Sequence, residues 1–278
     1  MPLIYNYTQG QALLTHAEVA ALSHDPRGAQ AQIASAVETA HTQTIAADQL
    51  DAADVARARA YADIAGEDRQ AATADTQAYV DDLKNDVGYG VGFDNLAALT
   101  QAMPLLAYAQ AQRGDFAKAL VSINATPRDC YTCVLVRGQI TTLQKDWNGA
   151  ATWFADAVKQ APSIPFAYGE WGAMLMTKGD LDGAIAKFTL ANQKGPHFAD
   201  PLEMWGEALI AKNRSDLALA KFDEANKYAP HWGRLHLKWG EALLWSGDKD
   251  SAQKQFAIAR ELDLTLSETS ELAKISHV

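Results

Sequence analysis

A step of 34 residues recurs along the second half of the chain and constrains its fold more than any other feature. Glycine, alanine, phenylalanine and proline each return at this interval, every type at positions of its own. The recurring residues are Gly138, Gly172, Gly206 and Gly240; Ala150, Ala184, Ala218 and Ala252; Phe154, Phe188, Phe222 and Phe256; Ala157, Ala191, Ala225 and Ala259; and Pro162, Pro196 and Pro230, with Leu264 in the fourth place. Agreement at several positions in one register indicates repeated units that stack on their neighbours.

The residue types indicate what the repeated unit is. Gly and Ala remove side-chain bulk where two helices of one repeat cross, and the Phe four residues after the first Ala fills the space beside them. Turns such as "KGD" at 178–180 and "SGD" at 246–248 end one helix with Gly, and their Asp can cap the next. Proline cannot extend the second helix and suits the start of the following repeat. The pattern therefore predicts helix–turn–helix units.

These motifs resemble the tetratricopeptide repeat, a helix–turn–helix unit, and the chain is similar to bacterial-type members of that family. The resemblance runs from Tyr131 to about Leu266, and 105–123 is a further repeat with a shortened connection. It implies an all-α fold, a right-handed superhelical solenoid of helix–turn–helix repeats. A degenerate repeat upstream has Gly66 in the turn, Ala71 in the small position and Asp75 where Phe is expected.

We expect three regions in the chain. Residues 1–93 form an N-terminal helical region with degenerate repeats, residues 94–266 the repeat solenoid, and residues 267–278 a C-terminal capping helix. A Gly-rich joint, "VGYGVGF" at 87–93, separates the first two regions. Ser267 is expected to cap the last helix.

Composition narrows the classes of partner. The net charge of −10 argues against nucleic acid, whose binding depends on phosphate neutralisation by Lys and Arg. The first residues, "MPLIYNYTQG", resemble neither a secretory signal nor a transit peptide. No apolar run approaches the roughly 18 residues needed to cross a bilayer. We therefore expect a cytoplasmic protein that binds neither nucleic acid nor membranes.

The chain has two cysteines, Cys130 and Cys133, in "DCYTC" at the start of a predicted helix. We interpret them first as small packing residues. A structural or regulatory disulfide is the alternative, because a helix N-terminus lowers a thiol pKa. Metal binding is disfavoured, since no second pair or nearby His completes a zinc site. With no nucleophile elbow, P-loop or zincin spacing either, we expect no enzyme activity, metal or cofactor.

Three "WG" pairs carry a tryptophan before the repeated glycine. They are Trp171, Trp205 and Trp239. We interpret them as a hydrophobic spine between helices rather than as an aromatic binding ladder.

The resemblance also implies which residues line the concave face of the solenoid. Tetratricopeptide proteins use fixed positions of the first helix of each repeat, helix A. Matching positions here are apolar at Phe166, Met176, Ile210, Leu244 and Trp245, and charged at Asp200, Glu203, Glu207, Arg234 and Glu241. The Lys and Asn residues with which chaperone-binding members hold a carboxylate are missing. The acids are equally well explained as an ordinary solvated helix face.

The expected function is a non-catalytic scaffold that binds a partner segment carrying apolar and basic residues. This expectation rests on the family resemblance, because a fold alone does not fix a function. A self-associating module, and hence a homo-oligomer, is one alternative. A redox-responsive regulatory module that is part of a larger regulator is another.

Overall fold

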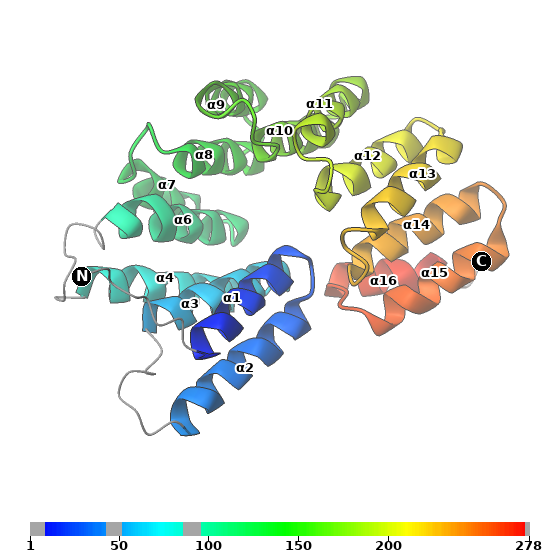
Figure 1. Cartoon of the computed structure of the whole chain (residues 1–278). Helices are drawn as coiled ribbons and strands as arrows, with labels where there is room; N and C mark the ends of the chain where they lie inside the picture. Colours follow the sequence, from blue (N-terminus) through cyan, green and yellow to red (C-terminus); the bar gives the residue numbers. More distant parts are fainter. Residues whose placement is uncertain (1–8, 43–51, 86–95, 276–278) are drawn as a thin grey trace. The chain divides into compact units, whose positions relative to one another are not determined.

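The computed structural model describes residues 9–42, 52–85 and 96–275, and all regular structure in these ranges is helical. The predicted all-α fold is confirmed (Figure 1). The chain divides into two compact units, unit 1 over Met1–Ala125 and unit 2 over Thr126–Val278. The predicted joint at 87–93, and with it the boundary after residue 93, lies outside the described residues. The three-region division therefore stays a prediction.

Unit 1 is built from pairs of helices that are consecutive in the chain. α1 (Gln9–Leu22) packs on α2 (Pro26–Thr42), α3 (Ala52–Ala65) on α4 (Arg69–Asn85), and α6 (Met103–Gln112) on α7 (Phe116–Asn124). A π-helical turn, η2 (Ala98–Ala102), leads into α6. The first helix of each pair is called helix A and the second helix B.

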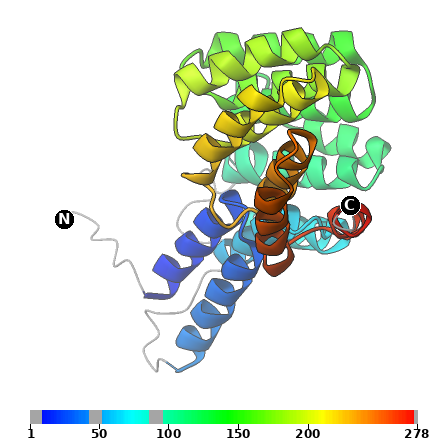
Figure 2. The ribbon, with the colours of Figure 1, turned by 90° about the vertical axis from the view of Figure 1, so that its right-hand side faces the viewer.

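Unit 2 continues the same arrangement with the regular repeats. Its pairs are α8 (Tyr131–Leu143) with α9 (Trp147–Gln160), α10 (Phe166–Lys178) with α11 (Leu181–Lys194), α12 (Ala199–Ala211) with α13 (Ser215–Asn226), and α14 (Gly233–Trp245) with α15 (Lys249–Glu261). α16 (Leu266–Ile275) follows the last pair. Figure 2 shows the green and yellow helices of this unit stacked in succession.

The repeated glycine and phenylalanine meet inside each pair of unit 2. A Cβ atom built on Gly172 would lie 2.5 Å from the ring of Phe188, and one on Gly206 would lie 2.6 Å from the ring of Phe222. Gly138 and Gly240 face Phe154 and Phe256 in the same way. All four rings are fully buried. Glycine therefore sets how closely the two helices approach, as predicted.

Unit 1 keeps this contact position with different residues. In unit 2 the Phe follows the Gly by 16 residues, and in unit 1 buried alanines are followed at the same distance by smaller partners. These pairs are Ala17 and Ile33, Ala60 and Thr76, and Ala107 and Ile123. An Ala in place of Gly adds a methyl group, and a partner smaller than Phe makes room for it, so the total volume is roughly kept.

The register of the degenerate repeat is corrected by one residue. Ala72, not Ala71, is the fully buried small residue of α4, and Thr76 takes the position expected for Asp75. The Thr76 hydroxyl donates a hydrogen bond to the Ala72 carbonyl at 2.7 Å, so it is satisfied inside the helix. Asp75 consequently lies beside the core position instead of in it.

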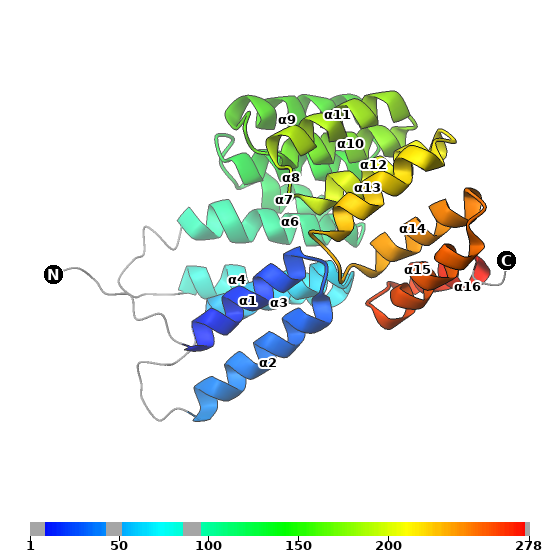
Figure 3. The ribbon, with the colours of Figure 1, turned by 45° about the vertical axis from the view of Figure 1, so that its right-hand side comes forward.

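The helix ends follow the predicted chemistry, with one exception. Asp180 and Asp248 each accept a hydrogen bond from a backbone N–H three residues later, at 3.0 Å. At α16 the cap is Thr265 rather than Ser267. Its hydroxyl accepts from the Glu268 N–H at 3.2 Å, and the Glu268 carboxylate accepts from the Thr265 N–H at 3.0 Å. This reciprocal pair is a capping box, and it fixes the start of α16. Figure 3 shows α16 in red at the end of the described part of unit 2.

Candidate functional site

The site predicted from the sequence lies on the helix A face of unit 2, formed by α8, α10, α12 and α14. Its aromatic members are exposed: Phe166 at 48% and Trp245 at 63% of their surface. Met176 and Leu244 are half-buried, whereas Ile210 is buried in the core between α12 and α13. Ile210 is therefore a packing residue and is not available to a partner.

Three of the four predicted acids on this face, Glu203, Glu207 and Glu241, contact a cation of unit 2. Arg234 of α14 contacts three carboxylates, those of Glu203 at 3.3 Å, Glu268 at 3.3 Å and Glu207. Glu203 and Glu207 come from α12, whereas Glu268 comes from α16. We call these four residues the Arg234 cluster. Its cation joins three helices of unit 2.

A second cation extends the cluster toward the end of the chain. Lys238 of α14 contacts Glu271 of α16 at 2.6 Å and Glu241 of its own helix at 3.3 Å. Lys238 and Glu241 are both buried. The basic residues that would attract acidic groups on this face are thus already paired, and α16 supplies two of their partners.

Burial shifts the protonation of the carboxylates in this network. Glu203 is fully buried, and desolvation raises its pKa well above the ordinary value, with the neighbouring Glu207 acting in the same direction. Burial likewise raises the pKa of Glu241 to about 7. The interpretation of these two acids as surface groups is corrected, because neither reaches solvent sufficiently to meet a partner. Asp200 and Glu207 remain half-buried.

A further acid, the half-buried Glu170 of α10, was not singled out from the sequence. Burial raises the pKa of Glu170 to about 7, and Asp200 contributes in the same direction, while a hydrogen bond from Gln139 opposes the shift. In the repeat register Glu170 lies one residue after Gly169, at a position that is apolar in the two neighbouring repeats. That mismatch is the sequence signal by which it could have been found.

Cys130 and Cys133 are joined in a disulfide at the start of α8. Two separate packing thiols, the interpretation favoured from the sequence, do not describe this state. Cys130 is the N-cap residue of α8, and its sulfur accepts a hydrogen bond from the Cys133 N–H at 3.2 Å. Redox activity of the pair stays a prediction.

A buried arginine forms hydrogen bonds to the segment before the disulfide. Arg137 of α8 donates to the carbonyl oxygens of Thr126 at 3.0 Å, Cys133 at 3.1 Å and Pro127 at 3.3 Å. Its guanidinium also lies 5.6 Å from the ring centre of Trp153. The connection into unit 2 is therefore tied to the body of its first pair.

The tryptophans of the "WG" pairs pack against the core, as the spine interpretation predicted. Two of these tryptophan rings also have a lysine ammonium group close to them, a contact that was not predicted from the sequence. The Lys187 ammonium lies 3.2 Å from the ring centre of Trp171, and the Lys221 ammonium lies 4.3 Å from that of Trp205. The two lysines are 34 residues apart, so the repeat step itself contained the signal.

The described residues offer neither a metal centre nor a membrane span. Among them no group of three or more His, Cys, Asp or Glu side chains is placed to hold a metal ion. Nor does that part of the chain contain a helix with the length and apolar character of a membrane span.

Comparison with known proteins relates the chain to solved structures only. No protein-family model matches it, and no curated protein matches it. PilF of Pseudomonas aeruginosa has a TM-score of 0.55 and 13% sequence identity, covering 66% of this chain and 86% of PilF. MamA has a TM-score of 0.46 at 19% identity over 64% of this chain and 95% of MamA. YrrB, described as a TPR protein with an unusual peptide-binding site, has a TM-score of 0.45 at 13% identity over 63% of this chain and 92% of YrrB.

Proposed function

Because the chain has a tetratricopeptide-repeat fold, we propose that it is a non-catalytic scaffold whose helix A face in unit 2 binds a segment of a partner protein. Stacked repeats present long surfaces suited to extended or helical segments. The fold leaves the partner open, so the chemistry of the exposed side chains decides what kind of segment fits.

The exposure of Phe166 and Trp245 is the observation that carries the proposal. Aromatic side chains in pockets are the usual anchors of protein interfaces, because they bury a large area and lose little conformational freedom. Phe166 is already held in place, since its ring packs edge-on against Phe198 with 4.8 Å between ring centres. An anchor that is ordered before binding loses less entropy when the partner arrives.

The proposed partner segment is mainly apolar with basic residues beside the apolar ones. Apolar side chains would cover Phe166, Met176, Leu244 and Trp245. Basic residues would be attracted by the net charge of −10 and by the half-buried Asp200 and Glu207. Since Glu207 already pairs with Arg234, the electrostatic part should act more on the association rate than on the affinity.

Photo-crosslinking from defined positions tests this proposal. The photoreactive residue p-benzoylphenylalanine is placed at Phe166 or Trp245, with Ile258 of α15 as a matched control because it is also exposed but lies on a helix B. We expect crosslinks to the same partner segment from the first two positions and none from Ile258. Equal crosslinking from all three positions, or crosslinking from Ile258 alone, would refute the helix A face as the binding surface.

A second candidate function, redox response, is favoured by the Cys130–Cys133 disulfide. In the cytoplasm, where we propose that the chain resides, glutathione and thioredoxin keep most thiols reduced, so a disulfide there would be transient and redox-sensing. Opening it would release the N-cap of α8 and alter the segment that Arg137 fastens.

Thiol alkylation followed by mass spectrometry tests the redox candidate. The chain is equilibrated with glutathione buffers of cytosolic ratio, and partner affinity is measured in both states. The Cys130→Ser/Cys133→Ser variant is the control, because serine can keep the N-cap hydrogen bond. Equal affinity in both states, or a pair that cytosolic glutathione never opens, would remove this candidate.

Self-association is the alternative use of the exposed Trp245. Light scattering over a concentration series distinguishes it from binding of a different protein. A homo-oligomer that Trp245→Ala dissociates would favour self-association, whereas a strict monomer at high concentration would exclude it.

A further inference from the structure

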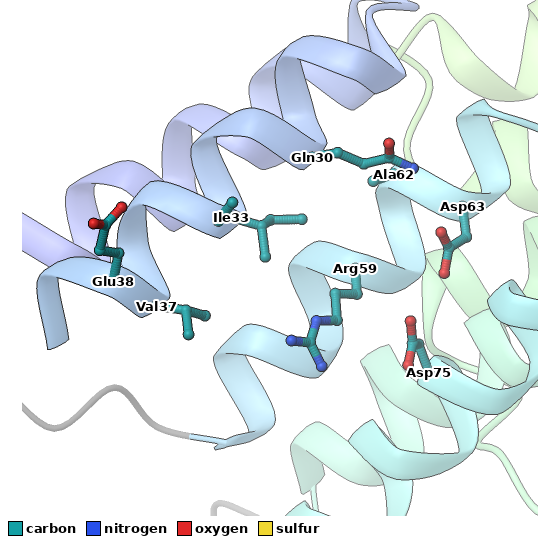
Figure 4. Close-up of a pocket in the computed structure, with 9 residues that line it drawn as sticks. Gln30, Ile33, Val37, Glu38, Arg59, Ala62, Asp63 and Asp75 are labelled. Atoms are coloured by element: carbon teal, nitrogen blue, oxygen red, sulfur yellow. The ribbon is translucent and has the colours of Figure 1, made fainter. Parts of the chain in front are cut away.

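A pocket of about 600 Å³ lies in unit 1 between α2, α3 and α4 (Figure 4). One wall is apolar and consists of Ile33, Ala34 and Val37 of α2 together with Ala62 of α3. The opposite side carries Arg59 and Asp63 of α3 and Asp75 of α4, and the polar Gln30 and the acidic Glu38 of α2 complete the lining. The pocket thus has an apolar side and an ionisable side facing one space.

Small side chains and the register of α4 create this pocket. Ala34 and Ala62 fill little of the space between α2 and α3. Thr76 occupies the core position of α4, so its neighbour Asp75 is directed toward α3.

The two carboxyl groups form a close pair at one end of the pocket. Figure 4 shows the oxygens of Asp63 and Asp75 facing each other across the gap between α3 and α4. Carboxylates that face each other disfavour each other's ionisation, and a proton held between them relieves the repulsion. The charged groups that act on Asp63 are Asp75 and Asp68, which disfavour its ionisation, and Arg59, which favours it. Burial and this neighbourhood raise the pKa of Asp63 to about 7.

We propose that this pocket binds an aliphatic ammonium group, with the alkyl chain along Ile33 and Val37 and the ammonium between Asp63 and Asp75. A compact cation with three N–H donors can replace the shared proton and satisfy both carboxylates at once. An anion would be repelled by the two carboxyl groups. Arg59 is the one cation among the residues that line the pocket, and it offsets only part of this repulsion. The ammonium can come from a lysine side chain of a partner protein or from a free alkylamine. This site is independent of the helix A face in unit 2.

Titration of the full chain with hexylammonium tests the proposal. We expect amide chemical-shift changes in α2, α3 and α4, and no such changes with hexanoate, which has the same alkyl chain and the opposite charge. Asp75→Asn and Asp63→Asn should each weaken hexylammonium binding by about tenfold or more, because each removes a charged hydrogen-bond partner. Asp81→Asn is the matched control, since Asp81 also belongs to α4 but is exposed, does not line the pocket and does not act on Asp63.

The shared proton gives the test a second readout. Binding of the ammonium should release a proton, so the affinity for hexylammonium should rise between pH 6 and pH 8, and the heat of binding should depend on the buffer. Hexanoate binding of similar strength, or unchanged hexylammonium affinity in a folded Asp75→Asn variant, would overturn the proposal. So would binding that is equally strong at both pH values.

Two ligands distinguish the source of the ammonium. Tighter binding of acetyl-Val-Lys-Val-amide than of 1,6-diaminohexane would assign the pocket to a lysine of a partner segment. The reverse order would assign it to free amines. Failure of both ligands to bind, under conditions where Asp81→Asn and the wild type are folded, would refute the site and leave the proposed binding on unit 2 unaffected.

Discussion

Replacement of Gly172 with alanine should destabilise the protein although it improves the helix propensity of α10. A Cβ atom at Gly172 would lie 2.5 Å from the ring of Phe188, which is fully buried among residues of α11 and α12. Overpacking of this kind costs about 1–3 kcal/mol. The change from Gly to Ala in a helix interior returns about 0.8–1 kcal/mol. Because the 2.5 Å contact is with a fully buried ring, the upper part of the overpacking range applies, and we expect a net loss of about 1–2 kcal/mol.

Gly169 offers a control in the same helix. Its Cβ atom would lie 3.3 Å from the Pro201 side chain and 3.8 Å from that of Phe198, so the neighbours have to move by only a few tenths of an ångström. For Gly169→Ala the helix propensity should dominate, with an effect between neutral and a gain of about 1 kcal/mol. The same substitution three residues apart is thus expected to differ by about 2 kcal/mol.

Urea unfolding followed by circular dichroism measures the difference, and hydrogen exchange of α10 and α11 locates it, because repeats can open separately. The Phe188→Leu background provides a double-mutant cycle. A smaller ring-free side chain should relieve the clash and reduce the cost of Gly172→Ala by at least about 0.5 kcal/mol. A Gly172→Ala variant as stable as Gly169→Ala, or a cycle without coupling, would show that the glycine does not set the helix spacing.

Three further predictions concern the charges and the distribution of stability. Arg234→Met should lower the free energy of unfolding by about 1–3 kcal/mol because Glu203, Glu207 and Glu268 lose the half-buried guanidinium that they share, and adding Glu203→Gln should restore part of it in denaturant titrations. Since the pKa of Glu170 rises from 4.5 to about 7 in the folded state, that state binds the extra proton and loses stability as the pH increases through this window. Glu170→Gln should therefore be more stabilising at pH 8 than at pH 5 in thermal melts, and an equal effect at both would contradict the shift. Hydrogen exchange should be faster in the described parts of residues 30–85 than in residues 165–260, and the opposite order would show that the stable core was misplaced.

The regular repeats were predictable from the sequence because their contacts depend on residues that recur. Gly172 and Phe188 are informative as a pair, since their types and their spacing reappear in each unit 2 pair. The corresponding position in unit 1 could not be recognised from the sequence. Ala17 and Ile33 fill a similar volume there, but both residue types are common throughout helices. The one-residue error at Ala71 arose for this reason: in an alanine-rich helix, composition does not mark which alanine is buried.

The candidate site was less predictable, because accessibility of a charged side chain depends on partners far away in the sequence. Glu203 and Glu241 occupy positions that are exposed in many helices, and their burial follows from Arg234 and Lys238 on α14. Two of the carboxylates that complete the network lie on α16, beyond the last full repeat. The repeat pattern gives helix positions but no information on which charges pair across helices.

The pairing of α16 has a consequence for lengthening the array. Glu268 follows Arg234 by 34 residues, so α16 takes the place of the next helix A and meets the previous one through opposite charges. A consensus repeat inserted after Leu264 would separate α16 from its cations unless the new helix A carried Arg and Lys at the positions of Arg234 and Lys238. Conversely, we expect α16 to pack on the last helix A of another repeat array if that helix is given Arg and Lys at the positions of Arg234 and Lys238. The attachment of α16 to the repeat before it is therefore encoded in two transplantable charges as well as in the apolar repeat.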